Sequence, residues 1–231
     1  MNTADATEQP NEFEQAYSRL VDCAKHAEPL GLSTGLKEVD RVLGGLRPGS
    51  LTVLTARPTT GKSALAMNIA LNIALGRGED SEAHRVCVFA LDDDRDSYLE
   101  RMLCIEARCA SHMIERGHIS GPDVERLKAS KKTLATAPFS VIGHPFPGTD
   151  WIRSRLRSEV NESGVELFLL DAAQRIHLSD GKYPQLDDDL RRIKNEIRDL
   201  EVPMLVLSDL CQPEDAKDSS CSFTHLCDLG V

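Results

Sequence analysis

The chain has 231 residues, a hydrophobic content of 41% and a formal net charge of −10, which suits one α/β domain with a sizeable core plus an appendage. The negative charge argues against broad electrostatic attraction to nucleic acid, although a ring can still hide a local basic channel. No apolar run approaches the roughly 20 residues of a membrane span, and the polar, acidic start is unlike a secretory signal.

The N-terminal segment, residues 1–29, is expected to stand apart from the core. Residues 1–11 are polar and predict a disordered start. Apolar side chains then recur at helical spacing over 12–27, and this helix must end before Pro29. Its apolar face can bury either against its own domain or against a neighbouring subunit, and the sequence leaves both open.

The core, residues 30–212, alternates strand and helix patterns. We expect strands at 51–55, 85–91, 139–142, 165–170 and 202–208, and helices over 35–43, 64–74, 97–115, 123–134, 149–163 and 186–200, with Thr149 as the N-cap of the fifth helix. This alternation predicts right-handed crossovers and a mostly parallel sheet covered by helices on both faces. Residues 213–231 lack a regular pattern and form an irregular tail.

A phosphate-binding loop is predicted between the first core strand and the alanine-rich helix. Strand, tight turn, Gly-Lys-Ser and helix form the context in which backbone N–H groups and a helix N-terminus converge on an anion. The motif departs from the usual pattern because Ala replaces its first Gly. A chance Gly-Lys-Ser in an ordinary strand-to-helix turn is the alternative. The predicted phosphate-binding residues are Ala56, Arg57, Pro58, Thr59, Thr60, Gly61, Lys62, Ser63 and Ala64.

Three further strands end in aspartates, at the edge where parallel sheets bind ligands. Asp171 follows four apolar residues and is predicted to hold Mg²⁺ opposite the Ser63 hydroxyl, while Lys62 reaches the outer phosphates. Asp92 is the candidate for orienting or deprotonating an attacking water. Gln174 is a candidate sensor of the γ-phosphate, and Asp209 ends the last strand. The alternative for Asp171 is an acidic residue that only terminates a strand.

Several stretches in order, among them 56–74, 152–174 and 186–210, resemble the C-terminal RecA-like ATPase domain of DnaB-type replicative helicases. Two features are typical of that family. One is a loop that begins Ala-Arg-Pro, and the other is the Asp-x-x-Gln motif formed here by Asp171 and Gln174. The resemblance covers roughly residues 30–212, and the helix at 12–27 occupies the place of the family's linker helix. It implies a ring, usually a hexamer, with ATP and Mg²⁺ between neighbours and single-stranded DNA in the central channel.

The departures from the family pattern predict a weakened catalytic site. Asp92 stands where the family has a catalytic glutamate, which draws the carboxylate back by about one bond length. Asp209 stands where the family has a glutamine sensor, and a carboxylate beside a γ-phosphate is repulsive. The loop at 176–190, expected to face DNA, contains four aspartates and one lysine, the wrong sign for gripping a phosphate backbone. The family's trans-acting lysine and arginine finger have no counterpart after Lys217.

Two functions from different classes therefore remain open. One is a DnaB-like ATP-binding helicase-family protein of DNA replication with a weakened catalytic site, whose enzyme activity the sequence leaves uncertain. The other is a degenerate nucleotide-binding regulatory or partner-docking module without unwinding activity. A fragment or frameshifted product with an altered tail from Cys211 is a third possibility. The seven irregular cysteines indicate reduced thiols and a cytoplasmic location, with a zinc site at Cys211, Cys221, His225 and Cys227 as the alternative.

Overall fold

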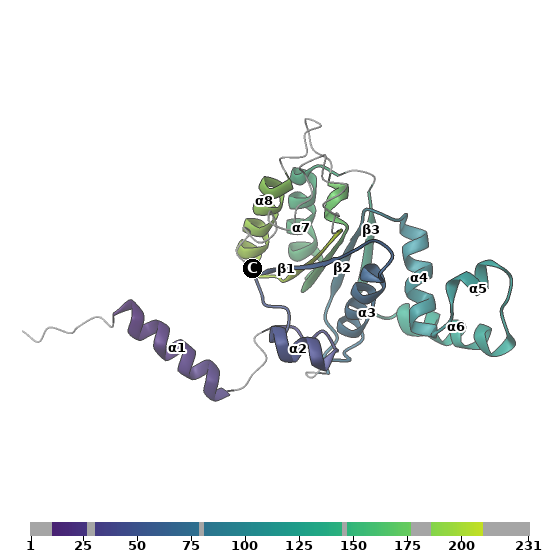
Figure 1. Cartoon of the computed structure of the whole chain (residues 1–231), viewed down its shortest axis with the longest axis horizontal. Coiled ribbons are helices and arrows are strands. Elements are labelled where there is room, and N and C mark those ends of the chain that lie inside the picture. The colour runs from purple at the N-terminus through teal and green to yellow at the C-terminus, as the bar shows by residue number, and fades with distance from the viewer. Residues whose placement is uncertain (1–10, 27–30, 79–80, 145–146, 177–185, 210–231) are drawn as a thin grey trace, which may run out of the picture.

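The computed structural model describes residues 11–26, 31–78, 81–144, 147–176 and 186–209. In these ranges five strands form one sheet in the order β1-β5-β4-β2-β3, and every neighbouring pair is parallel (Figure 1). The strands are β1 (Leu51–Ala56), β2 (Val86–Ala90), β3 (Phe139–Gly143), β4 (Leu167–Asp171) and β5 (Met204–Asp209). The predicted α/β fold with a parallel sheet is confirmed.

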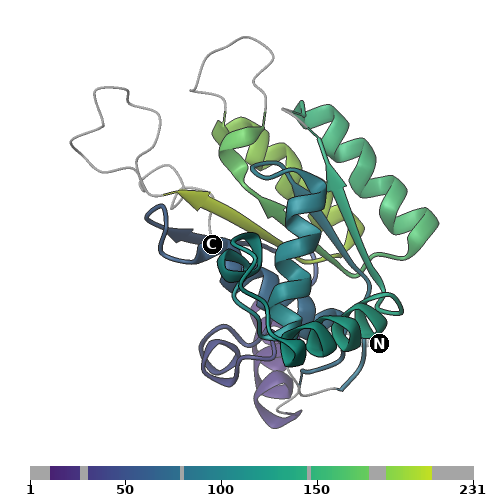
Figure 2. The same cartoon turned by 90° about the vertical axis from the view of Figure 1, so that its right-hand side faces the viewer.

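Helices cover both faces of this sheet. Helices α3 and α4 pack on one face and α7 and α8 on the other, while α6 lies outside α4 (Figures 1 and 2). The helices are α1 (Glu12–His26), α2 (Lys37–Leu43), α3 (Lys62–Ala74), α4 (Arg95–Ala107), α5 (Ser111–Glu115), α6 (Gly121–Leu134), α7 (Thr149–Ser163) and α8 (Leu186–Leu200), with a short 3₁₀ turn, η1 (Ala173–Arg175). Apart from α5, which the sequence did not separate from α4, these helices follow one another in the predicted order.

The central strands explain why the sequence has unbroken apolar runs. Successive side chains of a strand point to opposite faces, so Val86 and Val88 of β2 join the core under α3, whereas Cys87 and Phe89 join the core under α7 and α8. All four side chains are fully buried. A strand covered on both faces needs apolar residues at every position. Its sequence therefore lacks the alternation of polar and apolar residues that is typical of half-exposed strands.

We expect Leu169→Ala to lower the free energy of unfolding by about 3–5 kcal/mol. Leu169 is fully buried in the central strand β4, and its truncation removes apolar contact and leaves a cavity. Urea unfolding followed by circular dichroism measures the change. The matched control is Leu43→Ala at the end of α2, where the side chain is 41% exposed and the expected loss is below about 1 kcal/mol. Equal losses in the two variants would contradict this packing.

Three local expectations are wrong. The predicted single helix over 97–115 is two helices, because Arg108 has a left-handed backbone with φ 52° and ends α4. The helix expected from Asp123 begins at Gly121, since Ser120 and Asp123 form a reciprocal cap with Pro122 in the first turn. Thr149 is the first residue of α7, and Gly148 is its N-cap.

Helix α1 lies apart from the sheet and its covering helices (Figure 1). Its apolar stripe is open to solvent, with Phe13 82%, Tyr17 67% and Leu20 71% exposed. The sequence allowed the apolar face of α1 to be buried against its own domain or against a neighbouring subunit. The structure does not show burial against its own domain. The tail at 213–231 and the alternative zinc site lie outside the described residues.

Candidate functional site

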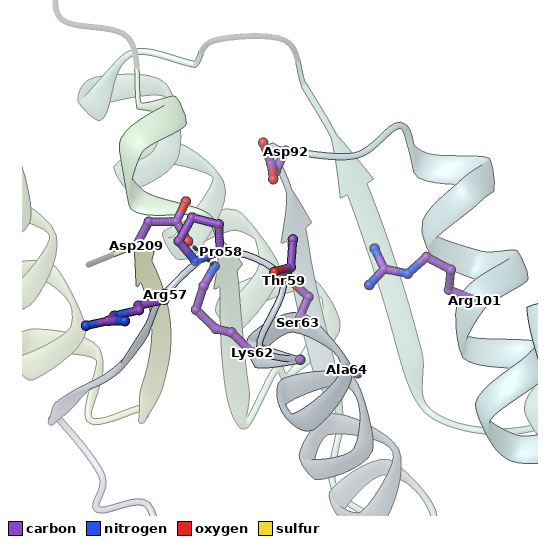
Figure 3. Close-up of a pocket in the computed structure, with 10 residues that line it drawn as sticks. Arg57, Pro58, Thr59, Lys62, Ser63, Ala64, Asp92, Arg101 and Asp209 are labelled. Carbon is purple, nitrogen blue, oxygen red and sulfur yellow. Dashed lines mark ion pairs between the residues drawn. The ribbon is translucent and has the colours of Figure 1, made fainter. Parts of the chain in front are cut away.

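The predicted phosphate-binding loop joins β1 to α3 at the carboxyl edge of the sheet (Figure 3). Gly61 caps α3 with φ 96°, a conformation that side chains rarely adopt, and a Cβ added there would meet nothing within 4 Å. Thr59 has φ 66°, a backbone angle that is unusual for a β-branched residue. Residues with such strained angles cluster at ligand-binding turns. The Thr60 hydroxyl donates to the Arg57 carbonyl at 2.7 Å. The turn therefore leaves open space in front of a helix N-terminus, where an anion is favoured.

A cavity of about 350 Å³ lies at this edge. It brings together most of the predicted site residues, from the loop, from the end of β2 and from the end of β5 (Figure 3). Ala56 and Thr60 of the predicted loop, and the deeper Asp171 and Gln174, do not line it. The lining residues are Arg57, Pro58, Thr59, Gly61, Lys62, Ser63, Ala64, Asp92, Arg101 and Asp209.

Asp171 lies buried behind the loop and is only 3% exposed. The Ser63 side chain hydrogen-bonds its carboxylate, whereas the Oδ1 atom is buried without a hydrogen-bond partner. Burial raises the pKa of Asp171, and the Ser63 hydrogen bond and the Lys62 charge only partly offset this effect. A hydroxyl beside an unsatisfied carboxylate oxygen is the donor set that suits Mg²⁺, so the residues present fit the predicted cation.

Asp92 is held by an arginine that the sequence patterns did not single out. The Arg175 guanidinium of η1 contacts the Asp92 Oδ1 atom through Nε at 2.7 Å and Nη2 at 2.6 Å. Both side chains are about half exposed, at 48% and 45%. The Asp92 Oδ1 atom, engaged in this way, is not free to accept a hydrogen bond from an attacking water. The candidate base is therefore already paired.

Lys62 is also engaged within the protein. Its ammonium lies 3.0 Å from the Asp209 Oδ1 atom, and the lysine side chain is only 9% exposed. Asp209 faces Ala56 across the parallel pair of β5 and β1, so strand register places its carboxylate beside the loop. Sequence reasoning placed Asp209 at the same edge, and the structure supplies its partner.

Gln174, the candidate sensor, is turned toward β5. Its Nε2 atom donates to the Ser208 hydroxyl at 2.7 Å and to the Asp209 carbonyl at 3.4 Å. Its Oε1 atom is buried without a hydrogen-bond partner. The side chain therefore lies behind Asp209 and braces the end of β5.

Arg101 of α4 is a second residue that sequence reasoning missed. It lines the cavity and forms an ion pair with Asp93, the residue after Asp92. By sequence alone, Asp93 and Asp94 could be a solvated charge run. In the structure, Asp93 binds Arg101, and Asp94 caps α4 by accepting from the backbone N–H groups of Asp96 and Ser97. The spacing of Asp93 and Arg101 carries no recognisable motif, so only the fold shows the pair.

The parallel sheet, its helices on both faces and the loop after β1 are those of the RecA-like P-loop nucleoside triphosphatases. Within this class, the chain belongs to the family described as DnaB-like helicase C terminal domain, whose model matches residues 31–229.

Two curated relatives show how much of a longer protein this chain covers. The replicative DNA helicase DnaC of Bacillus subtilis (strain 168) is 29% identical over 202 residues, 86% of this chain and 42% of that protein. The replicative DNA helicase DnaB of Geobacillus stearothermophilus is 30% identical over 190 residues, 80% of this chain and 41% of that protein. The chain thus spans about two fifths of the length of these relatives.

Solved structures share the fold. A DnaB-like replicative helicase, studied with its interactions with primase, superposes with a TM-score of 0.77 at 17% identity, covering 93% of this chain and 52% of that one. A second solved structure, described as an ATPase domain, gives a TM-score of 0.74 at 18% identity, covering 96% of this chain and 78% of that one. None of the helices in the described ranges is long and apolar enough to cross a bilayer.

Proposed function

We propose that this chain binds ATP with Mg²⁺ at the carboxyl edge of its sheet and serves, in DNA replication, as a helicase-family ATPase domain with a weakened catalytic site. The observation that carries the proposal is the convergence of Lys62, Ser63 and Asp171. The Ser63 side chain hydrogen-bonds an Asp171 carboxylate that keeps one oxygen unsatisfied. Lys62 and Ser63 are the first two residues of helix α3, and Lys62 lines the cavity in front of this helix.

Each of these residues has a distinct role in the proposal. The loop and the N-terminus of α3 hold the inner phosphates, and Lys62 holds the outer ones. Ser63 and Asp171 hold Mg²⁺, which neutralises charge on the outer phosphates when it is bound. Asp92 orients the attacking water, but only after it leaves Arg175. Slow hydrolysis is therefore expected even where nucleotide binding is good.

We expect Asp171→Asn to remove the dependence of nucleotide affinity on Mg²⁺. In the wild-type protein, Mg²⁺ should tighten nucleotide binding by about tenfold or more, which corresponds to about 1.4 kcal/mol. An amide at position 171 is a weaker cation ligand, so the two affinities should converge. Isothermal titration with Mg²⁺ and with excess chelator measures both. Asp150→Asn, at an 85% exposed position on α7, is the matched control. A wild-type protein that ignores both ATP and ADP at millimolar concentration would defeat the proposal.

A second function is favoured by the two ion pairs inside the site. Lys62–Asp209 and Asp92–Arg175 occupy the groups that hydrolysis needs, as expected of a nucleotide-binding module that acts by docking to a partner. Steady-state turnover with and without single-stranded DNA separates the two functions. DNA-stimulated turnover of about 1 per second or faster, an ordinary enzyme rate, would support the ATPase. Unchanged slow turnover would support the docking module.

The exposed stripe of α1 supports assembly through residues 12–27. Phe13, Tyr17 and Leu20 present apolar side chains to solvent on one helix, which in a stable protein is typical of an interface. A homo-oligomeric ring is the proposed assembly, and its mass in solution is the test. Single-stranded DNA is a less favoured partner because the loop at 176–190 is acidic. Of that loop, residues 177–185 lie outside the described ranges.

A further inference from the structure

The ammonium of Lys62 is held by a carboxylate of the protein's own sheet. Lys62 Nζ and Asp209 Oδ1 are 3.0 Å apart, and the aspartate side chain is 38% exposed while the lysine is 9% exposed. A lysine at this point of a phosphate-binding loop normally serves the outermost phosphates. Asp209 therefore places a negative oxygen where an outer phosphate oxygen would be bound.

The backbone that carries this carboxylate is held in place from two sides. Asp209 is in register with Ala56, the last residue of the strand that leads into the loop. Its carbonyl also accepts a hydrogen bond from Gln174 at 3.4 Å, and the neighbouring Ser208 hydroxyl accepts one from the same amide at 2.7 Å. Gln174 thus ties the end of β5 to η1. These contacts hold the backbone of Asp209 beside the loop, and the carboxylate itself is held by Lys62.

The Asp209 carboxylate has different effects on the binding of a nucleoside diphosphate and of a nucleoside triphosphate. The loop N–H groups and the helix N-terminus serve the inner phosphates, and Asp209 does not compete for them. A third phosphate must displace Asp209 from Lys62 and then stay beside the displaced carboxylate, and two like charges at close range repel. Of the other cavity cations, Arg57 points away from Lys62 in Figure 3, and Arg101, whose guanidinium points from α4 toward the loop, is already paired with Asp93.

We propose that Asp209 makes this site selective for a nucleoside diphosphate over the triphosphate. This inference rests on the proposed function, since it concerns the same phosphate site and refines its ligand. In a mixture of the two nucleotides at comparable concentrations, the resting protein then holds the diphosphate. Asp209 acts as the specificity-determining residue, through charge and position and without taking part in a chemical step.

Isothermal titration with Mg²⁺-ADP and with a Mg²⁺-ATP analogue whose β–γ bond cannot be hydrolysed tests the proposal. The wild-type protein should bind ADP at least about tenfold tighter than the analogue. Asp209→Asn keeps the shape of the side chain and removes its charge, so the ratio should fall toward one, mainly through tighter analogue binding. Asp209→Gln is the second variant, and it should shift the ratio in the same direction. Thermal unfolding verifies that both variants are folded.

Asp150→Asn is the matched control, because it removes a carboxylate that is 85% exposed on α7 and pairs with Arg153 and not with Lys62; it should retain the wild-type ratio. A wild-type protein that prefers the triphosphate analogue would overturn the inference. An unchanged ratio of ADP to analogue affinity in Asp209→Asn would also overturn it. Weaker analogue binding in that variant would do the same, because it would indicate a cation bridge between the carboxylate and the third phosphate. Binding of neither nucleotide by the wild-type protein would instead overturn the proposed function itself.

Discussion

Lys62→Ala should abolish measurable nucleotide binding, with a loss of affinity of about 100-fold or more. Hydrogen bonds to a charged group contribute about 1.5–3 kcal/mol each, and a loss of about 2.7 kcal/mol is 100-fold. The structure adds a second cause. Without the ammonium, the Asp209 carboxylate at 3.0 Å from it loses its partner and repels the incoming phosphates. Isothermal titration with a Mg²⁺-ATP analogue whose β–γ bond cannot be hydrolysed measures the effect.

A double variant separates these two causes. Lys62→Ala combined with Asp209→Asn should bind nucleotide more tightly than Lys62→Ala alone, because the unpaired carboxylate is gone. Lys128→Ala is the matched control, since this lysine lies on α6, is 67% exposed and pairs with Glu125. Affinity of Lys62→Ala within about threefold of wild type would show that the lysine does not serve the nucleotide at all, against the phosphate-binding role proposed for the loop.

Asp92→Glu combined with Arg175→Leu should raise ATP turnover by about 10–100-fold, up to the lower end of what a positioned general base contributes. The glutamate restores reach toward the attacking water, and the leucine removes the guanidinium that contacts Asp92 at 2.6 and 2.7 Å. Asp92→Glu alone should raise turnover less, because the longer carboxylate still meets Arg175. Phosphate release at saturating Mg²⁺-ATP measures all three proteins.

Arg198→Leu is the control for loss of a surface arginine, because Arg198 is 69% exposed and faces Asp199 at 3.8 Å on α8. Its turnover should equal that of the wild-type protein. If the double variant binds Mg²⁺-ATP and still turns over at the wild-type rate, the carboxylate at position 92 does not limit hydrolysis. The nucleotide-binding module would then be the better description of this chain.

Predictions from sequence succeeded where a pattern has one local cause. The loop between β1 and α3 was predicted because glycine at a left-handed position, followed by Lys62 and Ser63, has a recognised structural context. The buried strands were predicted because a sheet covered on both faces requires continuous apolar runs. Both are properties of a few consecutive residues, so one sequence suffices to find them.

Element ends were less predictable because neighbouring residues compete for the same role. Thr149 is a good helix cap by composition, yet Gly148 takes that position in α7. Arg108 ends α4 with a left-handed backbone that glycine or asparagine would ordinarily signal. In each case the path of the chain between packed elements outweighs a preference worth about 1 kcal/mol.

The amino-acid sequence already contained the fold class, the loop between β1 and α3 and the three aspartates at strand ends, because each depends on spacing along the chain. Only the folded chain decided which charges meet. Asp92 and Arg175 are 83 residues apart in sequence, and Lys62 meets Asp209 because β1 and β5 are in register. Ion pairs of this kind have no periodicity to detect, since the topology of the sheet and not the local sequence brings their partners together.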